Sequence, residues 1–261
     1  MENRLDGSRR LYGTPGYEFI VQAHIAVVGL GGVGSWAAEA LARAGVGQLT
    51  LVDMDAICPS NTNRQLHALT STFGKPKVEV MADRIAEINP RCRVHIIHDL
   101  ISKHTLHYLP EDLDYVIDAI DSVKHKAAMI HYCSRKKIPI MCAGGAAGKT
   151  DPTAVAIKDL NRTRNDPLLA KVRSFLRRYY GFSSNPKRRF GIRCVYSCEQ
   201  VRYPQPDGSI SSKRAPEKEG TMLGCEGGLG QSMCVTATFG LVAASFALNK
   251  IVEKGLRAKT L

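Results

Sequence analysis

The stretch "VVGLGGVGS" at residues 27–35 decides the fold of this protein. It ends the apolar run "HIAVVG", which is typical of a buried parallel strand, and leads into "VGSWAAEALARAG", whose apolar residues recur at helical spacing. A glycine-rich turn between a strand and a helix lets the backbone approach a phosphate, which the helix amino terminus attracts. The pattern therefore predicts a nucleotide-binding turn. Its glycines are Gly29, Gly31, Gly32 and Gly34.

Strands and helices continue to alternate after this turn. Helices are expected at 76–90 and 123–136, and strands at 48–55, 93–98, 114–121 and 137–143. This order predicts an α/β fold with a doubly wound, mostly parallel, Rossmann-like sheet, whose strands all end at one ligand-binding edge. No linker interrupts the chain. We therefore expect a single domain over 1–261, with a nucleotide-binding core at 1–150 and a C-terminal elaboration at 151–261.

A second glycine-rich stretch, "AGGAAGKT" at 143–150, resembles a phosphate loop. Such a loop needs a helix after its lysine, because the helix dipole holds the phosphate. Here "DPTAVAI" follows Lys149, and its alternating apolar residues indicate a strand. We expect this stretch to form a turn at the ligand edge instead of an ATP-binding loop.

The composition favours an anionic partner. The formal net charge of the 261 residues is +12, and 44% of them are hydrophobic.

The eight cysteines include no C-x-x-C pair, so reduced thiols in the cytoplasm are expected instead of disulfides or a zinc site. The apolar segment 233–249 is slightly short for a membrane span, and a buried or subunit-interface helix is favoured there.

Charged side chains after the second strand indicate a triphosphate. Asp53 ends that strand, where a carboxylate meets ribose hydroxyls, and Arg64 and Lys77 follow it. Asp118 and Asp121 stand at the end of the next parallel strand, "VIDAIDS". A nicotinamide site does not need these extra charges, whereas cations offset phosphate charge and an aspartate can hold Mg²⁺. Each residue taken singly has a plainer explanation, such as a surface charge or a helix cap.

The block "GLGGVGSWAAEALARAGVGQLTLVDMDAICPSNTNRQ", with "GKPKVE", "INP" and "VIDAIDS", resembles the core of the ubiquitin-activating-enzyme superfamily of ThiF, MoeB and HesA type. The resemblance covers about 9–145 and implies adenylation of a carboxylate by ATP. It implies that Asp53 holds the ribose, that Asn61, Arg64 and Lys77 clamp the triphosphate, and that Asp121 organises Mg²⁺. It further implies an arginine reaching across a dimer, for which Arg10 is the best match, with Arg9 and Arg4 as competitors. The remaining expected nucleotide-binding residues are Asp55, Asn63, Gln65 and Ser122.

Within this superfamily the chain resembles the branch that acts on transfer RNA. "RLYG", "NTNRQLHAL", "AIDSVKHKAA", "KIPI" and "VTATFG" are similar to the tRNA threonylcarbamoyladenosine dehydratases. The resemblance implies activation of the threonine carboxylate of a modified adenosine beside the anticodon, followed by ring closure with loss of water. A tethered nucleophile needs no enzyme thiol. Cys225 and Cys234 are accordingly interpreted first as inert thiols, with a nucleophilic role as the alternative.

A basic segment supports an RNA partner. Residues 171–193, "KVRSFLRRYYGFSSNPKRRFGIR", hold eight basic and no acidic residues, interleaved with five aromatic ones. Basic side chains neutralise phosphates and aromatic rings stack on unpaired bases. The alternative is an amphipathic helix at 166–180 whose aromatic rings face the core. The expected RNA contacts are Arg177, Arg178, Lys187, Arg188 and Arg189.

Three other functions stay open at this point. They are adenylation of a ubiquitin-like sulfur carrier, a non-catalytic nucleotide-binding scaffold, and a dinucleotide oxidoreductase. The expected ligands are ATP and Mg²⁺, with a monovalent cation as a further candidate. The expected partners are tRNA and a second copy of the chain, with a cysteine desulfurase or sulfur acceptor as a candidate and no membrane.

Overall fold

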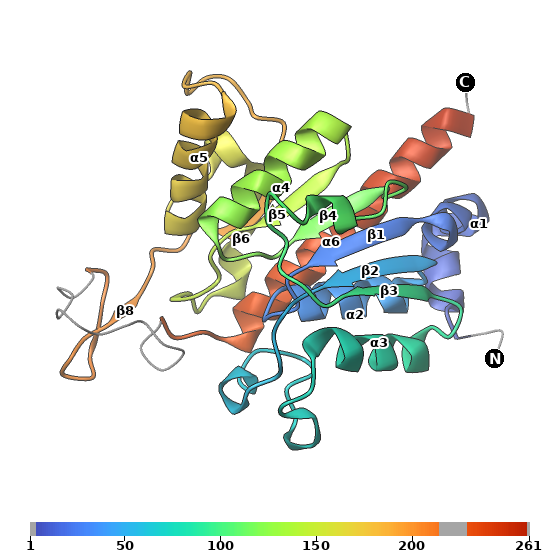
Figure 1. Ribbon diagram of the computed structural model, residues 1–261, viewed down its shortest axis with the longest axis horizontal. Helices are drawn as coiled ribbons and strands as arrows, with labels where there is room; N and C mark the ends of the chain where they lie inside the picture. The colour runs from blue at the N-terminus through green and yellow to red at the C-terminus, as the bar shows by residue number, and fades with distance from the viewer. Residues whose placement is uncertain (1–3, 214–228, 260–261) are drawn as a thin grey trace.

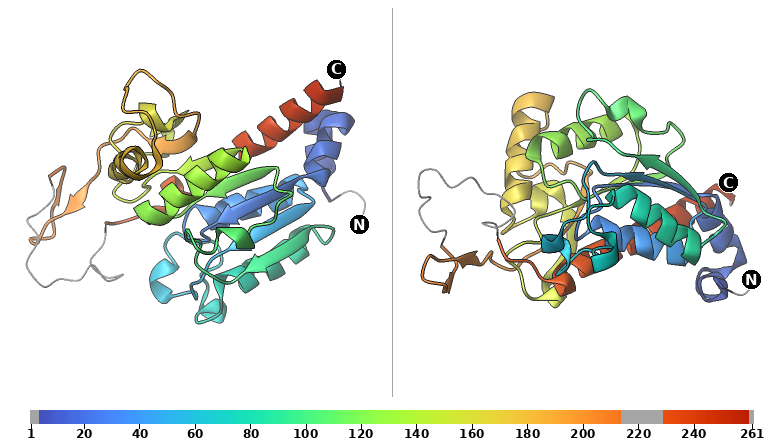
Figure 2. Two further views of the ribbon diagram at one scale, coloured as in Figure 1. Left: turned by 45° about the horizontal axis from the view of Figure 1, so that its top comes forward. Right: turned by 60° about the horizontal axis from the view of Figure 1, so that its bottom comes forward.

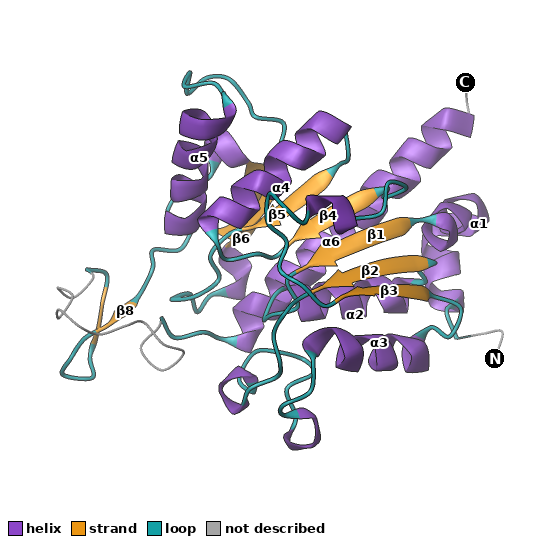
Figure 3. Cartoon of the chain, viewed as in Figure 1, coloured by secondary structure: helices purple, strands orange, loops and turns teal. Residues whose placement is uncertain are grey.

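A computed structural model describes residues 4–213 and 229–259 (Figure 1). Its helices lie beside a central sheet, and Figure 3 shows the two classes of element separately. The helices are α1 (Asp6–Gln22), α2 (Gly34–Ala44), α3 (Lys77–Ile88), α4 (Val123–Lys136), α5 (Pro167–Tyr180) and α6 (Met233–Lys259). Short 3-10 turns cover Pro59–Asn61, Thr70–Thr72, Leu106–Tyr108, Pro152–Ala154 and Leu160–Arg162.

The sheet has seven strands in the order β3-β2-β1-β4-β5-β7-β6. All neighbouring pairs are parallel except β6 and β7, which are antiparallel. The predicted doubly wound, mostly parallel sheet is therefore confirmed. The strands are β1 (His24–Val28), β2 (Gln48–Val52), β3 (Arg93–Ile97), β4 (Tyr115–Asp118), β5 (Ile140–Ala143), β6 (Val155–Asp159) and β7 (Arg193–Ser197).

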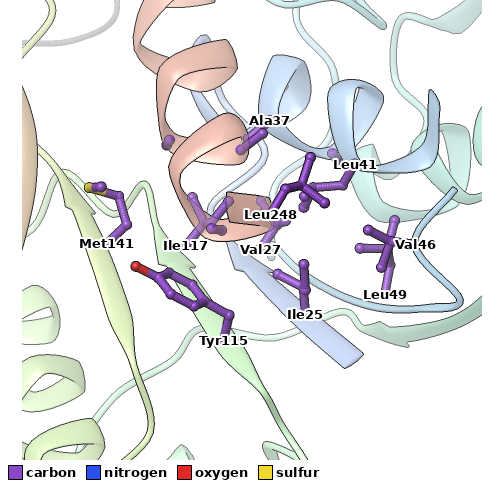
Figure 4. Close-up of a cluster of buried hydrophobic side chains, with 14 of the residues drawn as sticks. Ile25, Val27, Ala37, Leu41, Val46, Leu49, Tyr115, Ile117, Met141 and Leu248 are labelled. Atoms are coloured by element: carbon purple, nitrogen blue, oxygen red, sulfur yellow. The ribbon is translucent and has the colours of Figure 1, made fainter. Parts of the chain in front are cut away.

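Helices cover both faces of the sheet (Figure 2). One core packs α1, α2, α3 and α6 against one face, where Ile25, Leu41 and Leu248 meet (Figure 4). The other core packs α4 and α5 on the opposite face, around Ala127 and Leu176. Side chains alternate between the faces of a strand, so β1 supplies Val27 to the first core and Ala26 to the second. Burial on both faces explains why the central strands are apolar at nearly every position.

Three elements were not predicted from the sequence. Helix α1 is kinked at Gly13, which has φ 69° and ψ 160°, and it contains Pro15, so its local pattern is not that of a regular helix. Strand β7 enters between β5 and β6 after a long excursion in the chain. Residues 202–221 are polar and rich in turn residues, which predicts a loop, but their described part contains a small hairpin, β8 (Tyr203–Pro204) and β9 (Ile210–Ser211).

Helix α6 is long and apolar enough to span a membrane by length and composition, but 61% of its most apolar 18-residue stretch is buried inside the protein. It packs mainly against α2 and α1. A side chain at Gly240 would come within 2.4 Å of the carbonyl oxygen of Val33, so this glycine permits the close approach of α6 to the start of α2. The expectation of a buried helix at 233–249 is confirmed.

Candidate functional site

A cavity of about 650 Å³ lies at the carboxyl ends of β1, β2 and β4, where Val28, Val52 and Ala119 are among its lining residues. This is the edge at which ligands bind in open parallel sheets. Most residues predicted from the sequence line it together: Gly29, Gly31, Gly32, Asp53, Asp55, Asn61, Arg64, Gln65, Lys77, Asp121 and Ser122.

The glycine turn forms one wall of this cavity. Gly29 has a positive φ of 88°, and a Cβ on Gly34 would lie 1.7 Å from the carbonyl oxygen of Gly29. Gly34 therefore supports the turn without lining the cavity. In the described part of the chain, no side chain caps the start of α2 by a hydrogen bond. The backbone N–H of Ser35 donates to the carbonyl oxygen of Gly31 at 3.1 Å, but the positive dipole end of α2 has no side-chain acceptor and can attract an anion.

Two aspartates and a lysine occupy the mouth of the cavity. Asp53 accepts hydrogen bonds from the backbone N–H of Leu30 at 2.6 Å and from that of Asp55 at 2.8 Å. It thereby ties the end of β2 to the glycine turn. The Nζ of Lys77, in the first turn of α3, lies 2.8 Å from Asp55 and 3.8 Å from Asp53. A buried cation is thus held at the nucleotide edge by two carboxylates.

The loop before α3 presents polar side chains to the same cavity. Asn61 is buried, and its Oδ1 accepts a hydrogen bond from the backbone N–H of Cys58 at 3.1 Å. The Nε1 of Trp36 in α2 donates to the carbonyl oxygen of Arg64 at 3.1 Å, which fixes this loop over the glycine turn. The Oε1 of buried Gln65 has no hydrogen-bond partner among the described residues. An unpaired buried acceptor in a cavity is consistent with a ligand that donates to it.

The two aspartates of "VIDAIDS" have different environments. Asp121 is exposed and lines the cavity beside Ser122, the N-cap residue of α4. Asp118 is fully buried, and its Oδ1 lies 2.9 Å from the Nζ of Lys126. Although burial lowers it, the pKa of Lys126 is raised on balance by the charge of Asp118. The expectation that Asp118 serves the nucleotide edge is therefore wrong, because this carboxylate forms an internal ion pair beneath it.

The stretch "AGGAAGKT" forms the opposite wall of the cavity through Ala143, Gly144, Gly145, Ala146 and Ala147. Lys149 is buried, and its Nζ donates to the carbonyl oxygens of Asn165, Ser197 and Glu199. Burial lowers the pKa of Lys149. The chain then enters a 3-10 turn and strand β6. The prediction of a turn at the ligand edge, without a phosphate-loop helix, is confirmed.

Asp166 holds this second wall in place. Its carboxylate accepts hydrogen bonds from the backbone N–H of Gly145 and from that of Leu169, both at 2.9 Å. The second bond caps the start of α5. A Cβ on Gly144 would lie 2.1 Å from Asp166 Oδ2, so glycine is required there. Burial raises the pKa of Asp166.

Several lining residues were missed from the sequence. Asp99, Leu100 and Ile101 follow β3 at the same sheet edge, a position that the strand pattern alone could have indicated. Gln231, just before α6, and Thr236, in its first turn, come from a distant part of the chain, for which the sequence holds no local signal. The Nδ2 of the predicted Asn63 donates to the carbonyl oxygen of Gln231 at 3.0 Å, so this residue joins the two parts of the wall. The remaining residues not predicted as site residues include His125 and Leu168.

The basic segment lies on and after α5. Arg178, Lys187, Arg188 and Arg189 are exposed, whereas Arg177 donates to Ser183 and Asn161 and stacks on Phe190. The aromatic rings mostly support the amphipathic alternative. Those that pack against the second core are Phe175, Tyr180, Phe182 and Phe190, while Tyr179 is exposed.

Arg10 and Cys234 do not line the cavity. Arg10 is exposed on α1, and this helix lies beside the starting ends of the strands (Figure 1), whereas the cavity lies at their carboxyl ends. Cys234 is exposed in the first turn of α6, so it has a helix-dipole neighbour that the sequence pattern did not reveal. Cys225 lies outside the described residues.

Comparisons with known proteins agree with this geometry. The chain is 49% identical to the tRNA threonylcarbamoyladenosine dehydratase of Escherichia coli, over 97% of this chain and 95% of that protein. The structure of the E. coli enzyme TcdA in complex with ATP superposes with a TM-score of 0.86 at 46% identity, over 98% of this chain and 96% of that one. The E. coli molybdopterin-synthase adenylyltransferase is 36% identical over 51% of this chain and 52% of its own length. Residues 5–259 match the ThiF family, and the chain therefore belongs to this family.

Proposed function

We propose that this protein is an ATP-dependent tRNA threonylcarbamoyladenosine dehydratase. It adenylates the threonine carboxylate of N6-threonylcarbamoyladenosine next to the anticodon, and the activated group then closes a ring on itself. The observation that carries the proposal is one cavity with two walls. The glycine turn and the Asp53–Lys77 region form the nucleotide wall, and Gly144–Ala147 faces it.

The chemistry balances without another reactant. The carboxylate oxygen attacks the α-phosphorus of ATP, pyrophosphate leaves, and an acyl-adenylate forms. An atom of the tethered carbamoyl group then attacks the acyl carbon, AMP leaves, and the attacking group loses a proton. The net result is loss of one water from the nucleoside. Arg64 and Lys77 supply positive charge at the phosphate end, where charge accumulates as pyrophosphate departs.

The residues present fit ATP. The uncapped start of α2 suits a phosphate, and the unpaired Oε1 of Gln65 can accept a hydrogen bond from the nucleotide. Asp53 accepts the Leu30 N–H on one oxygen and the Asp55 N–H on the other, and these bonds hold its carboxylate after β2, where ribose hydroxyls would meet it. Asn61 lies beside it on the cavity wall.

Mg²⁺ belongs to the same proposal. In residues 4–213 and 229–259 no three His, Cys, Asp or Glu side chains cluster to hold an ion. Mg²⁺ commonly takes one or two carboxylates together with substrate phosphates and water. Asp121 would supply that carboxylate, with Ser122 beside it, and the ion would offset phosphate charge. A monovalent cation remains a prediction.

Ring closure without an enzyme thiol is supported by the composition of the walls. No cysteine lines the cavity in the described part of the chain. An intramolecular nucleophile can reach effective molarities of about 10⁵ M or more when it is held in line. A covalent thioester step is therefore unnecessary for this reaction. Closure requires that the second wall keep the carbamoyl group near the acyl carbon.

The exposed part of the basic segment is the proposed tRNA contact. Arg178, Lys187, Arg188 and Arg189 present positive charge on the side of the molecule where α5 lies. Phosphate contacts of this kind position an RNA without reading its sequence. Arg177 contributes indirectly, since it fixes the turn after α5 through Ser183.

A homodimer in the cytoplasm is the proposed form of the enzyme. Leu11 on α1 and Leu241 on α6 are 76% and 48% exposed, so both helices offer apolar surface to a second copy. Arg10, far from its own cavity, would then act in the partner's. Sedimentation tests the dimer, and a monomer at micromolar concentration would contradict it. Docking of a cysteine desulfurase or sulfur acceptor stays a prediction.

Mass spectrometry of tRNA nucleosides tests the function. After incubation with ATP and the protein, threonylcarbamoyladenosine should lose one water while AMP and pyrophosphate form in equal amounts. The alternative function, adenylation of a sulfur carrier, predicts ATP–pyrophosphate exchange driven by a carrier with a Gly-Gly tail. Exchange with the carrier and an unchanged nucleoside would overturn the proposal.

A further inference from the structure

A second, smaller cavity lies behind the second wall of the catalytic cavity. Its volume is about 310 Å³, and it opens between the start of α5 and the chain that leads into the β8–β9 hairpin. Both elements lie on the same side of the molecule, left in Figure 1. The polar and aromatic residues that line it are Asn165, Asp166, Arg173, Gln200, Tyr203 and Ser212.

The two cavities share a thin wall. Asp166 lines the smaller cavity, while its carboxylate holds Gly145, which lines the catalytic one. Val201 lines the smaller cavity and packs against Gly148, where a Cβ would lie 2.7 Å from Val201 Cγ1. A group bound in one cavity is therefore a near neighbour of a group bound in the other.

The smaller cavity has unused hydrogen-bonding groups. Arg173 donates to Leu160 and Thr163 through Nη1 alone, and the Nδ2 of Asn165 donates to Cys198 at 2.9 Å. Among the described residues, this leaves Nη2 and Nε of Arg173 and Oδ1 of Asn165 unpaired, together with the whole amide of Gln200. Donors and acceptors are thus both present, as the edge of a base requires.

An aromatic ring and positive charge complete the cavity. The ring of Tyr203 has no aromatic or cationic ring partner among the described residues. Two exposed cations adjoin the lining residues in the chain, Arg164 and Lys171, while the exposed Arg202 lies 3.9 Å from the carboxylate of Glu199. The nearby acids are engaged, since Asp166 binds backbone N–H groups and Glu199 accepts from Thr150 and Asp151. A nucleobase is a flat, uncharged ring attached to a phosphate backbone, and such a group matches this surface.

We propose that this cavity binds one unpaired nucleobase of the RNA, next to the modified adenosine, by stacking on Tyr203 and hydrogen bonding to Gln200 and Asn165. The inference rests on the proposed function. It adds that a base next to the modified adenosine leaves the RNA loop and binds in the smaller cavity, behind the second wall of the catalytic cavity. The enzyme would therefore recognise two adjacent nucleotides, one in each cavity.

The test uses anticodon stem-loop RNAs that carry the modified adenosine, intact or with a single abasic nucleotide beside it. Ring closure gives kcat/KM for each RNA. Stacking of a base on an aromatic side chain contributes about 1–3 kcal/mol, which corresponds to roughly fivefold to 150-fold in kcat/KM. We expect Tyr203→Ala to lose this factor on the intact loop, while Tyr203→Phe retains most of it. Gln200→Ala, at an exposed position, should lose less.

A double-mutant cycle makes the test specific. With the unchanged enzyme, the loop that lacks the bound base should show the same drop in kcat/KM that Tyr203→Ala causes on the intact loop. Tyr203→Ala should cause no further drop in kcat/KM on that abasic loop. Tyr108→Ala, a substitution of a half-exposed tyrosine outside this cavity, is the matched control and should change nothing. The KM for ATP should stay constant in all variants.

Each remaining outcome is decisive. Equal losses on intact and abasic loops, or no loss with Tyr203→Ala, would overturn the base-binding cavity while leaving the proposed function in place. Failure of the unchanged enzyme to close the ring on any of these loops, and on full-length tRNA, would instead overturn the proposed function.

Discussion

The ammonium group of Lys77 lies 2.8 Å from the carboxylate of Asp55, across the mouth of the nucleotide cavity. Lys77 is 5% exposed, whereas the Asp55 side chain is 61% exposed, so a buried cation is paired with a carboxylate that water can reach. Incoming phosphate can take the place of Asp55 at little cost, because the freed carboxylate is easily solvated.

Replacing Lys77 tests this exchange. Lys77→Ala removes positive charge where pyrophosphate departs, so kcat for ring closure should fall about 10²-fold or more. Arg64→Ala and Asp121→Ala should also abolish most turnover. Steady-state kinetics with tRNA and ATP measure the effect, and Lys75→Ala, at an exposed position two residues away, is the control. Near-normal rates in all three site variants would contradict the assignment.

Lys149 should contribute to the stability of the fold and not to the binding of ATP. Its ammonium group satisfies three backbone carbonyls, and Lys149→Ala leaves them unpaired in a buried region. The free energy of unfolding should drop by about 2–4 kcal/mol, measured by urea denaturation. Lys158→Ala, an exposed change on β6, should cost little. A large rise in the KM for ATP with normal stability would instead favour a phosphate loop.

His67 predicts a pH dependence of stability. It is buried, neither ring nitrogen has a partner among the described residues, and burial, aided by the charges of Lys77 and Arg84, lowers its pKa from 6.5 to about 4. Folding therefore favours the neutral ring. The stability from this group is complete above pH 6.5 and is lost progressively as the pH falls from 6.5 through about 4, by about 3 kcal/mol in all.

Comparison with His67→Phe isolates this effect. The variant keeps a buried ring without unpaired nitrogens, so its stability at pH 7 should equal or exceed that of the unchanged protein. Urea denaturation at several pH values should show the difference growing between pH 6.5 and 4 in favour of phenylalanine. A constant difference across that range would show that His67 does not titrate as described.

The exposed cations after α5 should govern the salt dependence of RNA binding. Substituting Lys187, Arg188 and Arg189 by alanine should weaken binding and flatten the plot of log affinity against log salt by about 0.7 for each phosphate that is no longer neutralised. Lys254→Ala, an exposed change on α6, is the charge control. Arg177→Ala should instead lower thermal stability, since this side chain holds Asn161 and Ser183. An unchanged slope would exclude these residues from the interface.

Much of the nucleotide wall could be predicted because its signals are local. The glycine turn needs a strand before it and a helix after it, and both are visible as apolar periodicity within 24–45. Asp53 directly follows β2, and parallel strands end at one edge, so its place near the glycine turn follows from topology. The same reasoning failed for Asp118, since a strand pattern does not tell which side chain at a strand end turns inward to meet Lys126.

The turn of the second wall could be predicted, but the long-range contacts around the cavity could not. Asp166 reaches Gly145 from α5, and Thr236 of α6 lies close enough to Gly32 that a Cβ there would be 3.3 Å away. Strand β7 enters the sheet between β5 and β6 against the chain order. None of these contacts produces a periodic pattern in the sequence, because each joins segments that are distant in the chain.

The amino-acid sequence by itself determined the strand–turn–helix unit, the parallel sheet and the charged residues of the nucleotide edge, because backbone preferences and hydrophobic period act over a few residues. The tertiary structure alone decided that the buried Lys149 donates to backbone carbonyls, that Arg177 supports a turn, and that two cavities share the wall held by Asp166. Those outcomes depend on which distant groups satisfy each buried charge, and that is settled only when the whole chain has packed.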